Sequence, residues 1–80
     1  MTVRMDTLDH LRVGQSARIR AIYLPEEMQI RMRDLGLIPG TVVHCMLKSP
    51  LGSPAAYEVR GAVLALRRSD ARQIQIEVSL

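Results

Sequence analysis

Turn-forming residues divide most of this chain into short segments, and their spacing limits what the chain can fold into. Pro39 and Gly40 are followed by residues 41–48, which are rich in β-branched and apolar side chains. Residues 49–54 then bring two prolines, one glycine and two serines, and Gly61 interrupts the chain again soon afterwards. This spacing leaves room for short strands and not for long helices. We therefore predict strands over residues 41–48, 55–60 and 62–66.

Alternating side chains indicate two further strands. Isoleucine and valine alternate with polar residues over 74–78, and alanine and isoleucine alternate with arginine at the start of 17–24. A period of two is typical of a strand with one buried face.

One segment, residues 25–35, has helical signals instead. Proline suits the first turn of a helix because its missing N–H costs nothing there, and the glutamates that follow complement the positive end of the helix dipole. Met28, Met32 and Leu35 repeat at helical spacing and predict an apolar stripe. We expect Met32, Leu35 and Leu37 to face inward. Leu24, Met28 and Arg31 are expected to remain partly exposed.

Glycine and proline also predict three structural turns. Gly36 is expected to end the helix as a left-handed cap, which would fold Leu37 back onto Met32. Pro39 and Gly40 fit the two middle positions of a type II turn. Gly61 marks a tight turn between two strands.

The remaining segments are short. Residues 8–14 read as a lead-in turn, and residues 69–72 as a single helical turn with Ser69 as its cap. The chain of 80 residues supports one domain, over 1–80. Five strands and one short helix predict an all-β fold, a small barrel of about five strands that closes its own sheet edges.

Composition excludes several classes of protein. A hydrophobic content of 48% is ample for a core. No apolar run approaches the roughly 18 residues of a membrane span, so we expect no direct membrane insertion. The N-terminus lacks the apolar stretch of a signal peptide, which predicts a cytoplasmic protein. The single cysteine, Cys45, cannot form an intrachain disulfide and fits a reducing compartment.

Nucleic acid is not an expected partner. The chain has two tyrosines and neither phenylalanine nor tryptophan, whereas single-strand binding uses aromatic stacking platforms. The net charge of +3 is too small to indicate nucleic acid, although it favours an acidic partner.

A catalytic or metal-binding constellation is hard to assemble. His10 and His44 are the only histidines, and His44 adjoins Cys45 on a predicted strand, so their side chains point to opposite faces. Such a pair can neither form a dyad nor share a metal, and Cys45 reads as a small buried hydrophobe. Metal-ligand spacings and a glycine-rich phosphate cradle are also absent from the sequence. We expect no enzymatic activity, no cofactor and no metal site.

The methionines and arginines leave two interpretations open. Met28 and Met32 share a helix face, and they serve either the core or a groove that faces a partner. The arginines, ten of the eleven cations, include the pairs 18 and 20, 31 and 33, and 67 and 68. Each pair is either a solvated face or a recognition point for carboxylate or phosphate groups.

The segment Leu35-Gly36-Leu37-Ile38-Pro39-Gly40 resembles the Leu-Gly-Leu-x-Pro-Gly hallmark of the ferrous iron transport protein A (FeoA) family. The later segments 51–54, 57–61, 63–67 and 71–74 resemble that family's pattern in the same order, so the resemblance covers roughly residues 5 to 78. Two positions depart from it. Ser53 stands where the family has Asp, and Met32 stands where Leu is more common, so any role of that Asp is not carried over.

The resemblance implies an SH3-like barrel with an accessory role in bacterial ferrous iron uptake. It also implies a partner, the cytoplasmic GTPase-bearing part of the FeoB transporter. The alternative that it leaves is a regulatory barrel that senses a metal or nucleic acid, like the C-terminal domain of metal-dependent repressors. Neighbouring genes, or a pull-down with the transporter's cytoplasmic part, would separate the two.

We place the expected partner-binding surface on the helix, its flanks and the proline-rich loop. Adaptable methionine beside leucine, with arginine at the rim, is a composition found at docking patches. An exposed Met and Leu stripe is equally compatible with a homo-oligomer. The predicted partner-binding residues are Leu24, Met28, Arg31, Met32, Arg33, Pro50, Gly52 and Pro54.

Overall fold

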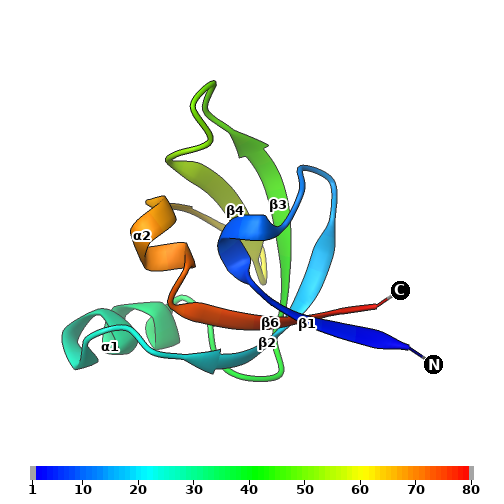
Figure 1. Ribbon diagram of the computed structural model, residues 1–80. Coiled ribbons are helices and arrows are strands. Elements are labelled where there is room, and N and C mark those ends of the chain that lie inside the picture. The colour runs from blue at the N-terminus through cyan, green and yellow to red at the C-terminus, as the bar shows by residue number, and fades with distance from the viewer. Residues whose placement is uncertain (1, 80) are drawn as a thin grey trace.

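The computed structural model describes residues 2–79, and its main feature is a curved antiparallel sheet (Figure 1). One helix, α1, has nine residues; a second, α2, is a single short turn, and a 3-10 turn, η1, follows the first strand. The elements in chain order are β1 (Val3–Thr7), η1 (Leu8–His10), β2 (Ser16–Ile22), α1 (Glu26–Asp34), β3 (Val42–Lys48), β4 (Ala55–Val59), β5 (Ala62–Leu66), α2 (Arg68–Ala71) and β6 (Ile74–Ser79).

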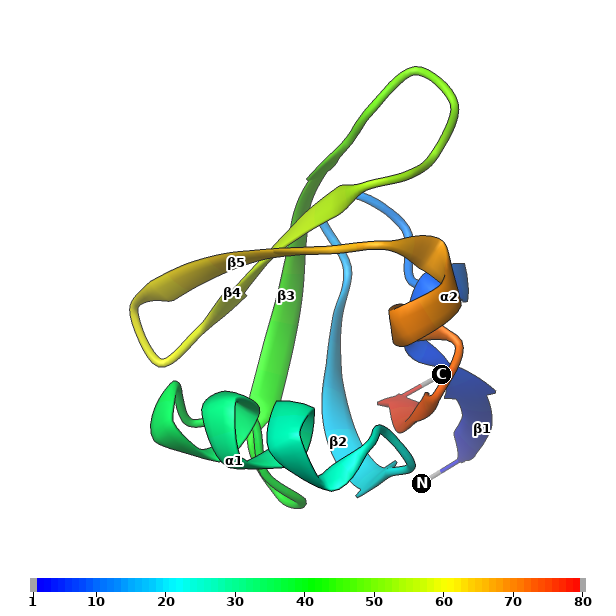
Figure 2. The ribbon, with the colours of Figure 1, turned by 90° about the vertical axis from the view of Figure 1, so that its left-hand side faces the viewer.

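All six strands belong to one sheet in the order β1-β6-β2-β3-β4-β5. The sheet curls, so that β5 crosses in front of β3 and α1 lies below it in Figure 2. In the part of the chain that the structure describes, no pairing joins the outer strands β1 and β5. The prediction of an all-β fold with one short helix is therefore confirmed, but the sheet has six strands and stays open instead of closing as a barrel of five.

The additional strand is β1, which lies before the predicted lead-in turn, over residues for which no element was predicted. Its residues pair with β6 from Val3 opposite Ser79 to Thr7 opposite Gln75. The first three residues of β1 are exposed, so its own sequence shows no alternation between core and solvent. Its extended form depends on a partner strand that is distant in sequence. The predicted lead-in turn is partly η1, whose Leu8 is buried.

The core lies inside the curl of the sheet. The alternation predicted for the last strand is confirmed, because Ile74, Ile76 and Val78 are all buried. Strand β2 ends at Ile22, earlier than predicted, after a register shift between Ile19 and Ala21. The buried apolar residues are Leu8, Leu11, Ala17, Ile19, Leu24, Met32, Leu37, Val43, Cys45, Ala55, Tyr57, Val59, Leu64, Leu66, Ala71, Ile74, Ile76 and Val78.

The C-terminal end of α1 has the predicted cap. Gly36 has φ +94°, in the left-handed region. Its N–H donates to the Arg33 carbonyl at 3.0 Å, and the Leu37 N–H donates to the Met32 carbonyl at 2.8 Å. These two bonds form a Schellman motif, and they return Leu37 to the core beside Met32.

The two predicted turns are also present. The Thr41 N–H donates to the Ile38 carbonyl at 3.1 Å across Pro39 and Gly40, and Gly40 has φ +95°, as a type II turn requires. At the β4–β5 turn, Arg60 and Gly61 both have positive φ, which is typical of a two-residue hairpin.

The predicted cap of the second helical turn is wrong. The helix α2 begins at Arg68, one residue before Ser69, and Arg67 is its N-cap residue without a side-chain cap of its own. The hydroxyl of Ser53, in the loop between β3 and β4, instead accepts the Arg68 N–H at 3.0 Å. A residue from a different part of the chain therefore satisfies this helix end.

Candidate interaction surface

A groove of about 300 Å³ lies between α1 and β5, the second strand of the β4–β5 hairpin. Figure 2 shows these two elements facing each other, with α1 below β5. Leucine and methionine dominate the lining, and one charged residue lies on each side. The groove is lined by Met28, Arg31, Met32, Leu35, Leu64, Ala65, Leu66 and Asp70.

The floor of this groove is the edge of the core. Met32 and Leu64 are each 8% exposed, and Leu66 is 4% exposed. Met28 packs partly buried against the same core. Leu35 is 44% exposed and stands at the open side. The groove thus combines a rigid apolar base with two more accessible side chains, Met28 and Leu35.

Two expectations about this face are wrong. Leu35 was predicted to face inward, but the helix ends at Asp34 and Leu35 is the exposed C-cap residue. Leu24 was predicted to remain partly exposed as a partner-binding residue, but it is only 4% exposed. It precedes the helix and fills the core beneath it, where no partner reaches it.

The charged residues of the groove are not used within the fold. Arg31 is exposed and Asp70 is partly exposed. Among residues 2–79, neither side chain lies in an ion pair within 4.0 Å. Both charges therefore remain available at opposite sides of an apolar surface, where they can orient a partner.

The structure brings together only part of the predicted surface. Met28, Arg31 and Met32 share the groove, whereas Arg33 lines a smaller pocket of about 120 Å³ beside Pro39. The loop that contains the other predicted residues lies at the opposite end of the molecule from α1 (Figure 1). Those residues are Pro50, Gly52 and Pro54.

Sequence reasoning missed the far wall of the groove. Strand β5 is apolar throughout, so its sequence does not show that Leu64 and Leu66 are the buried residues, nor which helix they meet. Asp70 lies in a helical turn with no local pattern of function. Only the curl of the sheet brings these three residues to α1.

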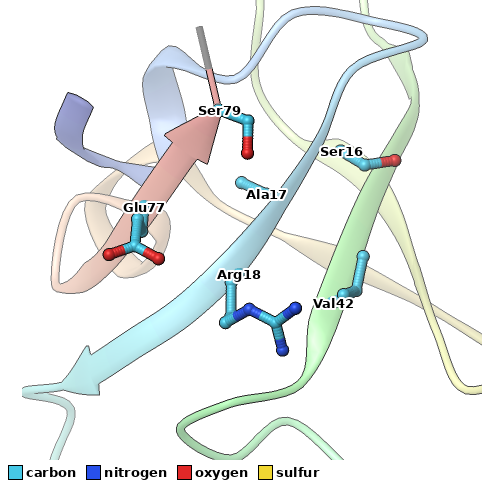
Figure 3. Close-up of a pocket in the computed structure, with 6 residues that line it drawn as sticks. All are labelled: Ser16, Ala17, Arg18, Val42, Glu77 and Ser79. Atoms are coloured by element: carbon cyan, nitrogen blue, oxygen red, sulfur yellow. The ribbon is translucent and has the colours of Figure 1, made fainter. Parts of the chain in front are cut away.

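A shallower depression lies between the strands β6, β2 and β3 (Figure 3). Its volume of about 160 Å³ is below the usual size of a small-molecule site, about 300–1,000 Å³. The Arg18 guanidinium at its edge already donates to the Gly40 carbonyl at 2.7 Å. This depression is therefore smaller than a typical ligand pocket.

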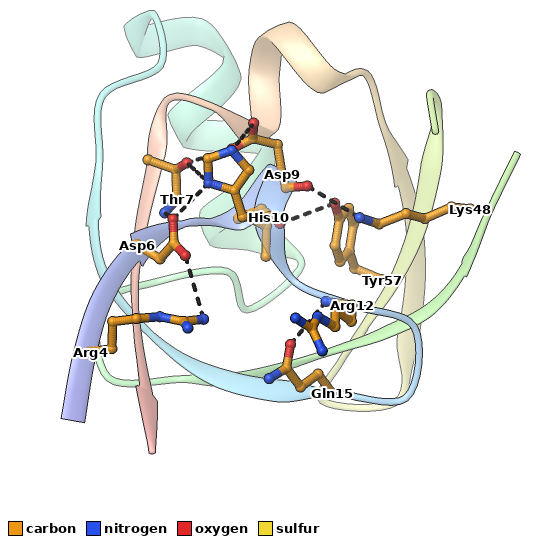
Figure 4. A network of polar contacts seen from close by, with 10 residues as sticks. Arg4, Asp6, Thr7, Asp9, His10, Arg12, Gln15, Lys48 and Tyr57 are labelled. Carbon is orange, nitrogen blue, oxygen red and sulfur yellow. Dashed lines mark hydrogen bonds and ion pairs between the residues drawn. The ribbon is translucent and has the colours of Figure 1, made fainter. Parts of the chain in front are cut away.

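A polar network joins β1 to η1 (Figure 4). His10 Nδ1 lies 2.7 Å from Asp6 Oδ1, and His10 Nε2 lies 3.5 Å from Asp9 Oδ2. The hydrogen bond to Asp6, followed by the charge of Asp9, raises the pKa of His10. The same bond, with the Thr7 N–H, lowers the pKa of Asp6. These contacts fasten the outer strand to the turn that follows it.

No group of three or more His, Cys, Asp or Glu side chains in residues 2–79 is arranged to hold a metal ion. Cys45 is buried, as predicted, and burial raises the pKa of its thiol. Its neighbour His44 is half-buried, and His44 Nδ1 lies 2.8 Å from the Ser16 hydroxyl. Cys45 is thus a core residue and not a nucleophile.

Comparison with known proteins finds a family model that matches most of this chain. Residues 7–78 match the family model of the FeoA domain. No curated protein matches this chain in sequence. Among residues 2–79, none of the helices is both long and apolar enough to cross a bilayer.

Solved structures give the same result. The FeoA protein from Chlorobium tepidum is 27% identical, with a TM-score of 0.88 over 94% of this chain and 71% of the other. The zinc complex of FeoA from Stenotrophomonas maltophilia, a prokaryotic SH3 domain protein, is 28% identical, with a TM-score of 0.76 over 89% of this chain and 88% of the other. A manganese-dependent transcriptional repressor is 17% identical, with a TM-score of 0.81 over 100% of this chain and 44% of the repressor. The repressor shares the fold alone.

Proposed function

Because this chain belongs to the FeoA domain family, which is associated with ferrous iron transport, we propose that it is a cytoplasmic accessory protein of bacterial ferrous iron uptake. It acts by binding and not by catalysis. Its partner is the cytoplasmic GTPase-bearing part of a FeoB-type transporter. The α1–β5 groove is the surface that receives this partner.

The observation that carries the proposal is the composition of the groove. Met28 and Leu35 stand accessible above a floor of buried leucine and methionine. Methionine adapts its shape to a partner because it is unbranched and flexible. Arg31 and Asp70 add a charge of each sign at the rim, which selects one orientation of the partner.

The buried thiol of Cys45 supports a role that does not involve catalysis. Cys45 has no accessible surface, and burial raises the pKa of its thiol, both of which are typical of a structural cysteine. His44 and His10 are engaged with Ser16 and Asp6. The likeness to a manganese-dependent repressor is one of fold at 17% identity, so it carries no regulatory function to this chain.

A matched pair of helix variants tests the groove. Leu35 is 44% exposed and lines the groove, whereas Ile30 is 47% exposed on α1 and does not line it. We expect Leu35→Glu to weaken capture of the transporter's cytoplasmic part at least tenfold in a pull-down, because it places a charge on the apolar face. Ile30→Glu should bind like the wild type.

Both variants should keep their melting temperature, because changes at exposed positions usually cost within about 0.5 kcal/mol. Met28→Asp is a poorer probe because Met28 packs against the core, so a loss of binding could not be distinguished from a loss of stability. Equal capture of the Leu35→Glu and Ile30→Glu proteins would exclude the groove. Sedimentation of the free protein as a dimer that Leu35→Glu dissociates would instead assign the groove to a second copy of this chain.

A further inference from the structure

The end of the molecule opposite α1 carries apolar side chains that the core does not use. Leu51 is 87% exposed, Leu47 57%, Met46 41% and Val13 57%. Two hydrogen bonds join the turn at residues 11–15 to β3, from the Gly14 N–H to the Cys45 carbonyl at 2.8 Å and from the Cys45 N–H to the Gln15 carbonyl at 3.0 Å. Both loops rise from the same end in Figure 1. We call residues 11–15 and 46–54 the hairpin tip.

The exposure of two consecutive apolar residues has a structural cause. Cys45 pairs with Tyr57 and Leu47 pairs with Ala56, so the register between β3 and β4 skips Met46. This bulge places one extra residue in β3 and disturbs the strict alternation of its side chains. As a result, Met46 and Leu47 both lie outside the core.

The loop that presents Leu51 is held in shape. The Arg68 guanidinium donates to the Leu51 carbonyl at 2.8 Å, and the Gly52 N–H donates to the Ser49 carbonyl at 2.7 Å. These bonds restrict the loop before binding, which lowers the entropy that is lost when the loop inserts an apolar side chain into an apolar phase.

The charges of the hairpin tip have one sign. Residues 11–15 and 46–54 contain Arg12 and Lys48 and neither aspartate nor glutamate. Arg67 and Arg68 lie at the border, because they follow Leu66, which pairs with Ala55 at the end of the loop. The side chain of Asp9, in the turn just before residues 11–15, is only 8% exposed. The tip therefore presents apolar side chains beside the exposed Arg12 and Arg67, since the Lys48 ammonium donates to the Asp9 carbonyl at 3.2 Å.

We propose that the hairpin tip docks on an anionic phospholipid surface, with its cations among the headgroups and Leu47 and Leu51 in the interfacial layer. Lysine and arginine near a membrane are attracted by anionic lipids, and apolar side chains beside them gain by entering the boundary of the acyl chains. The protein lies on the bilayer and does not span it.

The shape of the tip favours lipid over a protein partner. The three pockets described above contain no residue of the tip, so none of them would receive the anchor residue of a protein docked there. Aromatic residues, which are enriched in protein interfaces, are absent from residues 11–15 and 46–54. A projecting loop with a leucine at its end can bury that side chain in the deformable interface of a bilayer without a preformed cavity.

Fluorescence gives a direct test, because the chain has no tryptophan of its own. The test protein is Leu51→Trp, and the control is Tyr23→Trp, which replaces a residue that is 67% exposed at the end of β2. We expect vesicles of phosphatidylglycerol and phosphatidylcholine to shift the emission of the Leu51→Trp protein to shorter wavelength. Pure phosphatidylcholine should leave it unchanged, and the Tyr23→Trp protein should respond to neither.

Charge variants test the same surface by vesicle sedimentation. One exposed cation near an anionic surface contributes about fivefold in affinity, so Arg12→Gln with Arg67→Gln should weaken binding roughly 25-fold. The groove variant Leu35→Glu should bind vesicles like the wild type, so failure here and failure of the proposed function are distinguishable.

Three results would overturn the proposal. They are no binding to phosphatidylglycerol vesicles, equal binding to phosphatidylcholine, and full binding by the Arg12→Gln, Arg67→Gln protein. Loss of transporter capture by Leu51→Glu, with no vesicle binding by the wild type, would assign the tip to a protein partner instead.

Discussion

The two glycines on either side of residues 37–39 allow the cost of backbone strain to be measured separately from the cost of a clash. Gly36 has φ +94° and Gly40 has φ +95°. A Cβ at Gly40 would meet no atom within 4 Å, whereas a Cβ at Gly36 would lie 2.8 Å from Cδ of Arg60. Alanine at either position therefore faces the same backbone strain, and only the Gly36 variant also meets a neighbour.

The magnitudes follow from that geometry. An L residue in the left-handed region costs about 1–2 kcal/mol, which lowers the melting temperature of a domain of this size by about 4 to 16 °C. We expect this loss for Gly40→Ala. Gly36→Ala should lose the same amount plus the cost of moving Arg60, about 0.5–1.5 kcal/mol for a displaced rotamer.

A double-mutant cycle in urea checks the assignment. Arg60→Ala removes Cγ and Cδ but keeps a non-glycine residue at φ +52°. In that background, Gly36→Ala should cost no more than Gly40→Ala does in the wild type. If Gly40→Ala proved neutral while Gly36→Ala remained costly, positive φ would not be the cause and the reasoning would be refuted.

Three further predictions concern contacts outside the groove. The hydrogen bond to Asp6 raises the pKa of His10 above 6.5, so its stabilisation is complete below pH 6.5 and is lost as the pH rises through the raised value. The pKa of Asp6 is lowered from 3.8, so the same stabilisation is also lost when acidification takes the pH through that lowered value. The difference in urea midpoint between wild type and His10→Gln should therefore be largest between these two limits. A difference that does not depend on pH would contradict this. Cys45 should resist a chromogenic thiol reagent in the native protein and react fully in urea, and rapid native labelling would show that the thiol is accessible. Ser53→Ala should cost about 0.5–2 kcal/mol of stability in urea denaturation, because it removes the acceptor for the first N–H of α2; Ser69→Ala is the control and should be neutral.

The features that the sequence predicted best are those decided within a few residues. The left-handed cap at Gly36 and the turn at Gly40 depend on backbone angles that glycine alone adopts freely. The bounds predicted for β5, Ala62–Leu66, are those of the structure, because the tight turn at Gly61 marks where the strand begins.

The features that the sequence did not predict depend on distant partners. Strand β1 exists because β6 pairs with it, and the cap of α2 comes from Ser53 across a loop. The candidate groove was predicted on its helical side alone, since its other wall, Leu64 and Leu66, arrives only when the sheet curls. Leu35 fitted the helical stripe but lies beyond the last helical residue, so periodicity placed it on the wrong side.

The position of β6 in the sheet also constrains the order in which the molecule folds. β6 is the last strand in sequence, yet it lies between β1 and β2. The first strand therefore has no hydrogen-bonding partner until the final residues of the sheet are in place, and closing this pairing links nearly the full length of the chain. Contacts between such distant segments slow folding, because the entropy of loop closure is lost before the contacts form. We expect the hairpin of β3 and β4 to form early and the N-terminal strand to join last, in the same step that completes the core around Ile74 and Ile76.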